Sequence, residues 1–217
     1  MTPLAVEPHA LEHYGFRQEG AARVAGRDAL VFLLEPIDLL RYAQRLWVDK
    51  ATGLMLRADV LGPAPHHGVV ESTAFSEVEI GIKPQPETIA ADARSLEGYR
   101  IVRPVQQRTQ LEAEGWTLAR KVPGFLPAGC VKRPLEAPSD DARVPEPVLQ
   151  ALFSDGLAHV SLFIETYDPR RHLSEVQAHL GATTTVMRRR DAHWITVVGD
   201  APVATLRLFA DGLERLR

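Results

Sequence analysis

The sequence predicts an α+β fold made mostly of antiparallel β-structure, and three observations carry this prediction. Runs that alternate polar and apolar residues recur through residues 12–82, separated by turns that contain Gly, Pro or Asp. Similar runs return between residues 116 and 199. Residues 202–215 instead repeat apolar side chains at every third or fourth position, which is typical of an amphipathic helix.

The first part of the chain predicts an antiparallel meander. Residues 23–36 read as two strands with a bend at Gly26-Arg27-Asp28. Residues 45–49 and 54–61 form a hairpin pattern, closed by Lys-Ala-Thr-Gly, and residues 69–81 read as a longer strand. We expect a sheet or an open barrel here.

Two proline residues and a polar stretch then predict a linker. We expect a first domain over residues 1–90, a linker over 91–115 and a second domain over 116–217. The second domain is expected to contain a strand over 116–125, a Pro-rich loop over 126–150, a strand over 158–166, a helix over 169–180 and strands over 182–189 and 193–198.

The final helix is the clearest helical prediction. Asp200 is expected to cap its N-terminus, with Pro202 in the first turn. Its apolar stripe comprises Val203, Leu206, Phe209, Leu213 and Leu216.

Composition excludes several classes of protein. A net charge of -3 with 24% charged residues argues against nucleic acid as the main partner. One cysteine permits no disulfide within the chain. The first residues lack the basic and apolar regions of a secretory signal, and no run reaches the ~18 apolar residues of a membrane span.

The candidate catalytic and metal-binding residues favour simpler interpretations. Ser154-Asp155-Gly156 near His159 holds the residue types of a triad, but it lacks the Gly-x-Ser-x-Gly spacing and fits a turn. His66-His67 has no third metal ligand nearby and fits a turn between strands. Cys130 lies in a Pro/Gly-rich segment, where we expect a loop and no nucleophile. We therefore expect no catalytic residue, no metal site, no cofactor and no enzymatic activity.

A loop after the first two strands concentrates charge. Glu35, Asp38 and Arg41 supply two carboxylates and a guanidinium. Catalysis is one interpretation, and an Asp–Arg pair that fixes the loop is the favoured one.

Two sets of residues are candidates for binding. Arg188, Arg189 and Arg190 with His193 form a dense basic cluster, which suits an acidic peptide or a phosphorylated lipid head group, or else a solvated hairpin edge. The second set is a group of apolar residues that would line a lipid cavity in an open barrel, although ordinary core is favoured. Its members are Val31, Leu33, Trp47, Leu54 and Leu56.

Several short blocks together resemble the MucB/RseB family. They are Arg23-Val24-Ala25-Gly26-Arg27, Pro36-x-Asp38-x-x-Arg41-Tyr42, Leu46-Trp47-Val48-Asp49-x-x-Thr52-Gly53-Leu54, Pro123-Gly124-Phe125, Ser154-Asp155-Gly156-Leu157-Ala158-x-Val160-Ser161-x-Phe163 and Thr196-Val197-Val198-Gly199-x-x-Pro202. The blocks follow the order of that family and span most of the chain.

The resemblance implies a periplasmic, non-enzymatic regulator of the envelope-stress sigma factor. Such proteins bind the periplasmic domain of an anti-sigma factor of the RseA/MucA type and protect it from proteolysis until a lipid or lipopolysaccharide signal releases it. The resemblance also implies that the first domain is the C-terminal part of an open β-barrel like LolA and LolB, which begins before Met1, followed by a smaller sheet-plus-helix domain. A periplasmic lipid or lipoprotein carrier is the alternative function. An exposed sheet edge left by a partial barrel is expected to favour self-association into a homo-oligomer.

Overall fold

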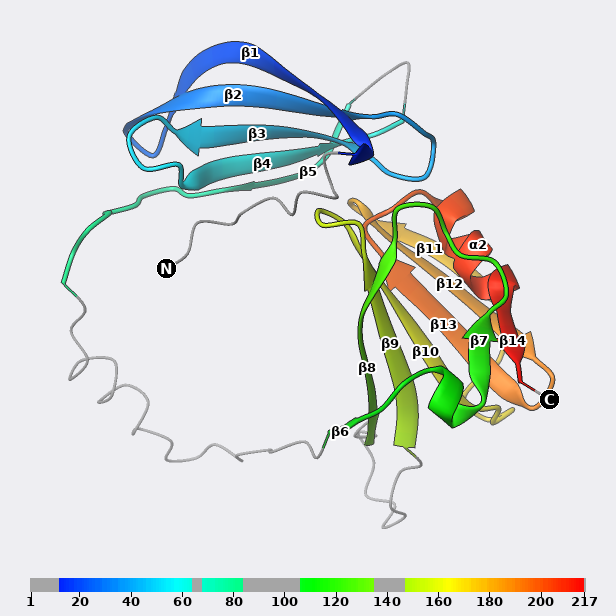
Figure 1. Ribbon diagram of the computed structural model, residues 1–217. Coiled ribbons are helices and arrows are strands. Elements are labelled where there is room, and N and C mark those ends of the chain that lie inside the picture. Colours follow the sequence, from blue (N-terminus) through cyan, green and yellow to red (C-terminus); the bar gives the residue numbers. More distant parts are fainter. Residues whose placement is uncertain (1–11, 64–67, 84–105, 135–146, 217) are drawn as a thin grey trace.

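The described part of the chain folds into two main antiparallel sheets that meet end to end (Figure 1). The computed structural model describes residues 12–63, 68–83, 106–134 and 147–216. In Figure 1 the first sheet lies above the second, and helix α2 covers one face of the second sheet. This arrangement confirms the predicted class, mostly antiparallel β-structure with one α-helix in the described ranges.

The first sheet has five strands in sequential order. They are β1 (Tyr14–Val24), β2 (Arg27–Pro36), β3 (Ala43–Asp49), β4 (Met55–Leu61) and β5 (Val69–Ala74). The β1–β2 turn places Ala25 and Gly26 at positive φ, 48° and 74°, which is the geometry of a tight hairpin and which glycine adopts without strain. The meander predicted for this region is therefore confirmed. The predicted strand over 69–81 is shorter, since β5 ends at Ala74.

The second sheet has seven strands in the order β11-β12-β13-β10-β9-β8-β6. They are β6 (Gln107–Arg108), β8 (Leu126–Pro134), β9 (Pro147–Ser154), β10 (His159–Thr166), β11 (Val176–Leu180), β12 (Thr183–Arg190) and β13 (His193–Gly199). A two-stranded ribbon joins β7 (Trp116–Leu118) to β14 (Leu213–Arg215), and the 3₁₀ helix η2 (Glu112–Glu114) precedes β7. Strand β6 and η2 lie inside the predicted linker, so that part of the range 91–115 belongs to the second unit.

Helix α2 (Val203–Gly212) supplies the core of the second unit. Leu206 and Phe209 are fully buried on the sheet, together with inward residues of β10 and β13 such as Val160 and Ile195. Two details of the predicted helix are wrong. Pro202 occupies the N-cap position, and the side chain of Asp200 accepts a hydrogen bond from Thr183 instead of capping the helix. The helix also ends at Gly212, and the next residues pair with β7.

Two further predictions for the second unit are wrong. The range 169–180, predicted as a helix, ends in strand β11, because β12 offers an open edge and residues 176–180 pair with it in antiparallel register. The Pro-rich range 126–150, predicted as a loop, supplies β8 and part of β9. Among its described prolines, Pro127 lies beside a bulge, and Pro134 and Pro147 lie at strand ends, where a missing N–H does not break the sheet. The predicted strand over 116–125 shortens to β7, and a bend at residues 119–120 follows it.

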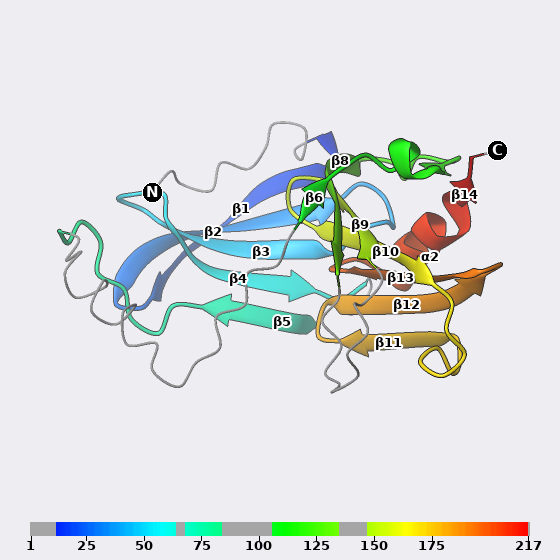
Figure 2. The ribbon, with the colours of Figure 1, turned by 90° about the horizontal axis from the view of Figure 1, so that it is seen from below.

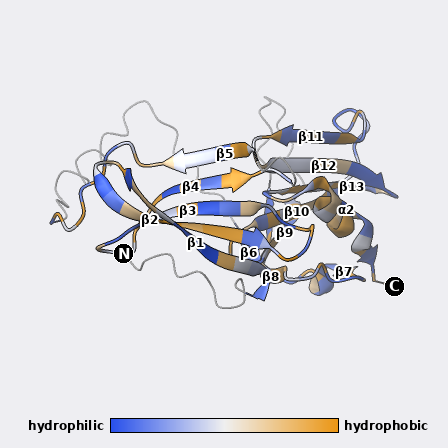
Figure 3. Ribbon diagram, turned by 90° about the horizontal axis from the view of Figure 1, so that it is seen from above, coloured by the Kyte–Doolittle hydropathy of each residue, from blue (hydrophilic) through white to orange (hydrophobic). Residues whose placement is uncertain are grey.

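The first sheet does not close on itself in the described part of the chain, since β1 and β5 are its two edges. In Figure 3 its apolar segments run along β2 and the end of β4. One face packs Tyr14, Leu34 and Leu46 against Leu157 of the second unit. This face brings the two units together.

Candidate binding site

A buried ion pair joins the two units. Arg41, in the loop between β2 and β3, extends into the second unit toward Asp155, with Nε 3.6 Å from Oδ2. Both side chains are 0% exposed. Asp38 lies 3.3 Å from Arg41 Nε, and Arg41 Nη2 donates to the carbonyl of Pro123 at 2.7 Å. The predicted Asp–Arg pair thus exists, and its arginine also crosses to the other unit.

Asp155 stabilises its own turn through hydrogen bonds and also forms the ion pair with Arg41. Its Oδ1 accepts the backbone N–H groups of Leu157 and Ala158 at 2.9 and 2.7 Å. Its Oδ2 accepts the hydroxyl of Tyr14 at 3.1 Å. Burial and the charge of Asp155 raise the pKa of Tyr14, so the phenol stays protonated and donates. We call Tyr14, Asp38, Arg41 and Asp155 the junction.

The segment Pro123-Gly124-Phe125 packs against the guanidinium of Arg41. The guanidinium lies 5.3 Å from the centroid of the Phe125 ring. Gly124 has φ +79°, and a Cβ there would lie 2.7 Å from both terminal nitrogens of Arg41. Only glycine fits this position without displacing Arg41.

Two further contacts hold the units together. The hydroxyl of Thr205 in α2 donates to the carbonyl of Leu40 at 2.6 Å, and Leu40 packs on the second core. Elsewhere along the interface, Glu71 of β5 accepts the N–H of Ala182 at 3.1 Å. Figure 2 shows β5 and β11 along the same flank, end to end. The sheets therefore form one body with a buried polar centre.

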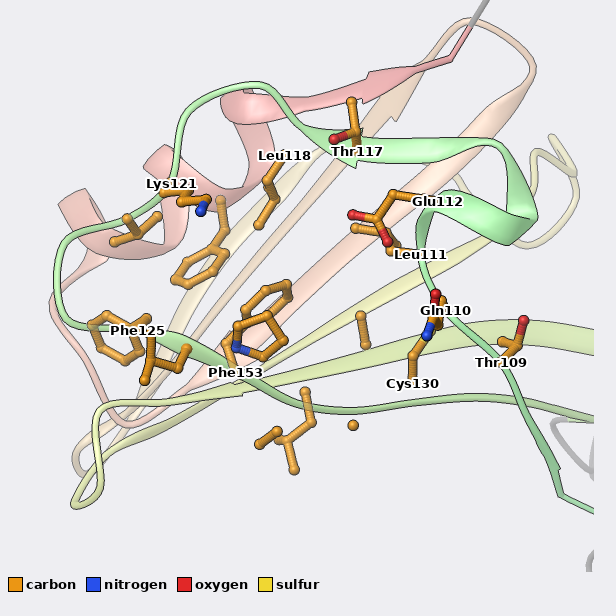
Figure 4. A pocket seen from close by; sticks show the side chains of 18 residues that line it. Thr109, Gln110, Leu111, Glu112, Thr117, Leu118, Lys121, Phe125, Cys130 and Phe153 are labelled. Atoms are coloured by element: carbon orange, nitrogen blue, oxygen red, sulfur yellow. The ribbon is translucent and has the colours of Figure 1, made fainter. Parts of the chain in front are cut away.

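The second unit also contains a pocket of about 570 Å³ (Figure 4). It lies between β8 and the segment from Thr109 to Phe125, which curves above it. Phe153 and Phe209 line it, and both are buried. We call this the β8 pocket. The sequence alone does not indicate a binding site at residues 109–125, because only the fold brings them opposite β8.

The predicted basic cluster does not form one surface. Successive residues of a strand point to opposite faces. Arg188 pairs with Asp211, and Arg190 donates to backbone carbonyls at the C-terminal end of α2. Arg189 lies over the Tyr167 ring at 4.1 Å. All three side chains therefore have partners within the protein.

His193 and the predicted lipid-facing residues also have internal neighbours. His193 packs edge-on against Trp116, and burial, together with Arg215, lowers its pKa. Val31 pairs with Trp47, so these two share a face of the first sheet.

The other three residues of the apolar set lie in different places. Leu33, two residues from Val31, lies on the same face. Leu54 lies outside β4, and Leu56, inside β4, is buried. The guanidinium of Arg57 lies 4.4 Å from the centroid of the Trp47 ring and also binds the buried Asp59. Burial alone would raise the pKa of Asp59, but hydrogen bonds from Arg57 and Ser72 outweigh it and lower that pKa. The face is therefore partly charged.

The remaining candidates do not form a reactive centre. Ser154 donates to the carbonyl of Ala158, as a turn residue does. Cys130 lies in strand β8, contrary to the predicted loop, and its pKa is raised by burial and by Glu114 and Glu112. His66-His67 lies outside the described residues. Within the described residues, no group of three His, Cys, Asp or Glu side chains could hold a metal ion. None of the helices described there is long and apolar enough to cross a membrane.

The comparisons with known proteins match both units. The family model for the MucB/RseB N-terminal domain matches residues 4–112, and the model for the MucB/RseB C-terminal domain matches residues 110–214. The chain is 29% identical over 197 residues to the sigma factor AlgU regulatory protein MucB of Pseudomonas aeruginosa, covering 88% of this chain and 58% of that protein. It is 26% identical over 202 residues to the sigma-E factor regulatory protein RseB of Escherichia coli K12, covering 93% and 59%.

A solved structure extends this likeness to three dimensions. The MucA/MucB complex of Pseudomonas aeruginosa contains a chain that is 27% identical, with a TM-score of 0.74 over 99% of this chain and 70% of that one. The chain spans slightly less than three fifths of the length of the curated relatives named above.

Proposed function

Because the chain belongs to the MucB/RseB family, we propose that it is a negative regulator of an envelope-stress sigma factor. It binds the periplasmic domain of a membrane anti-sigma factor of the RseA/MucA type and protects that domain from proteolysis. A lipid or lipopolysaccharide signal releases it. The proposal places the protein in the periplasm and assigns it no enzymatic activity.

One observation carries the proposal. The similarity to a MucB chain solved with MucA covers 99% of this chain, so it includes both sheets. A protein that binds a partner through preformed surfaces binds it more tightly when its two units keep a fixed relative orientation. The junction supplies that relation here through the contacts of Arg41 and Asp155.

The first unit is the proposed sensor. We propose that its five strands are the C-terminal part of an open barrel like LolA, which would contact lipid through the face of Val31, Leu33 and Trp47. The ion pair of Arg57 and Asp59 on this face does not favour the alternative of a lipid carrier, because a cavity that encloses a lipid is lined mostly by apolar side chains.

Calorimetric titration of the purified chain with the periplasmic segment of its anti-sigma partner tests the proposal. We expect micromolar or tighter binding, and slower cleavage of that segment by its protease when the chain is present. A folded chain that neither binds the segment nor slows its cleavage would refute the function proposed for it. Arg189→Glu in the same assay tests the basic cluster, because it leaves the Arg188 and Arg190 contacts with α2 in place. Unchanged affinity would remove Arg189 from the interface.

A further inference from the structure

Strand β8 has an open edge beside the β8 pocket. Its neighbour β6 pairs only with Val131 and Lys132, and Thr109 N–H donates to the Cys130 carbonyl at 3.1 Å. Residues 126–129 have no strand on that side in the described part of the chain. They are exposed and carry no charge, although charge is the commonest protection of an edge strand.

The open edge borders an apolar depression. The β8 pocket is lined along one side by Leu126–Cys130, and the buried aromatic rings of Phe153 and Phe209 also line it. The opposite wall includes Leu118 and comes from the segment that curves over the pocket (Figure 4). A ligand here meets backbone hydrogen-bonding groups on one side and aromatic and aliphatic side chains on the other.

The rim of the pocket carries charges of both signs. Lys121 and Glu112 lie on the covering segment, with Leu118 between them in Figure 4. Both are exposed, and neither belongs to an ion pair among the described residues. A segment with an apolar residue between an acidic and a basic residue complements this rim.

We propose that an extended peptide segment of the anti-sigma partner docks here, adding to the open edge of β8 and placing one large apolar side chain in the pocket. This inference rests on the function proposed above and assigns its contact site. Backbone hydrogen bonds to β8 would supply part of the affinity, and the pocket would supply the specificity, as in other strand-addition complexes.

The apolar side chain carries most of the binding in this arrangement. Pro127 has no N–H, and the register of β8 against β9 shifts between Pro127 and Gly129, so the edge accepts only a short strand. A short strand needs a buried anchor, and a site about 570 Å³ in volume accommodates a large side chain.

Variants of the full chain, titrated calorimetrically with the partner's periplasmic segment, test the proposal. Leu126 is 54% exposed, so Leu126→Asp adds a charge to the open edge without disturbing the core. Cys130→Trp fills the pocket from its wall. We expect at least tenfold weaker binding for each. Leu208→Asp is the matched control, because Leu208 is 43% exposed in the same unit and lies outside the pocket lining. Equal melting temperatures exclude misfolding.

Hydrogen exchange on the wild-type complex supplies a second measurement. We expect slower amide exchange at residues 126–130 when the segment is bound, because strand addition protects backbone N–H groups. Wild-type affinity in both pocket variants, or protection confined to another edge such as β11, overturns this inference and leaves the proposed function intact. A wild-type chain that does not bind the segment overturns both.

Discussion

Removal of the charge of Asp155 is expected to destabilise the junction strongly. In Asp155→Asn the turn keeps its acceptor for Leu157 and Ala158, but Arg41 loses a buried counter-charge. The remaining partners of Arg41 are the carboxylate of Asp38, at 29% exposure, and one carbonyl. Breaking a fully buried ion pair from one side costs about 3–5 kcal/mol. For a chain of this length, that lowers the melting temperature by roughly 10 °C.

Differential scanning calorimetry provides the measurement. We expect Asp155→Asn to lower the temperature of the first unfolding transition. We also expect the two units to unfold in separate transitions. Asp38→Asn is the matched control, and we expect a loss of at most about 1 kcal/mol because its side chain is partly hydrated. Arg41→Met combined with Asp155→Asn should cost less than the sum of the single changes. Equal, small losses for Asp155→Asn and Asp38→Asn, with additive behaviour of the pair, would refute this account of the junction.

Three further outcomes follow from the same structure. Gly124→Ala should lower the free energy of unfolding, measured in urea, by about 1–3 kcal/mol. The positive φ of Gly124 and its contact with Arg41 leave no room for a methyl group, and wild-type stability would contradict this. Phe209→Ala should lower the free energy of unfolding by about 3–5 kcal/mol because Phe209 is fully buried. Leu208→Ala, on the exposed face of the helix, should change it by at most about 0.5 kcal/mol. Similar losses in the two variants would contradict the assigned burial. His193 has a pKa below its ordinary 6.5, so its neutral form stabilises the fold above that pH, and this stabilisation is lost as the pH falls through the lowered pKa. His193→Gln should therefore reduce the loss of unfolding free energy in acid titrations below about pH 6.5, and an unchanged pH slope would refute this role.

Local patterns were reliable where neighbouring strands are also neighbours in sequence. The first sheet is a meander in which each strand pairs with the next, so alternation and turn residues were sufficient to predict it. The apolar stripe was likewise predicted from its spacing, and Leu206 and Phe209 are buried in α2 as expected, whereas Leu216 lies beyond the helix and is exposed. Asp38 and Arg41, three residues apart, formed the predicted pair.

Predictions failed where distant pairing decided the conformation. Residues 176–180 are a strand only because β12 presents an edge to them. Cys130 lies in a strand because β9 pairs with that stretch, although Pro and Gly suggested a loop. Arg188, Arg189 and Arg190 looked like one basic patch, and the alternation of a strand distributed them between two faces.

The sequence by itself determined the β-rich class, the final helix, the loop pair of Asp38 and Arg41 and the family. The tertiary structure alone decided that Arg41 forms an ion pair with Asp155 and that Tyr14 donates a hydrogen bond to the same aspartate, 141 residues away. It alone placed the segment that ends at Phe125 over the open edge of β8. Local periodicity reports which face of an element is buried, but it contains no information about which distant element buries it. A junction and a pocket built from separate parts of the chain are therefore defined only after the chain has folded.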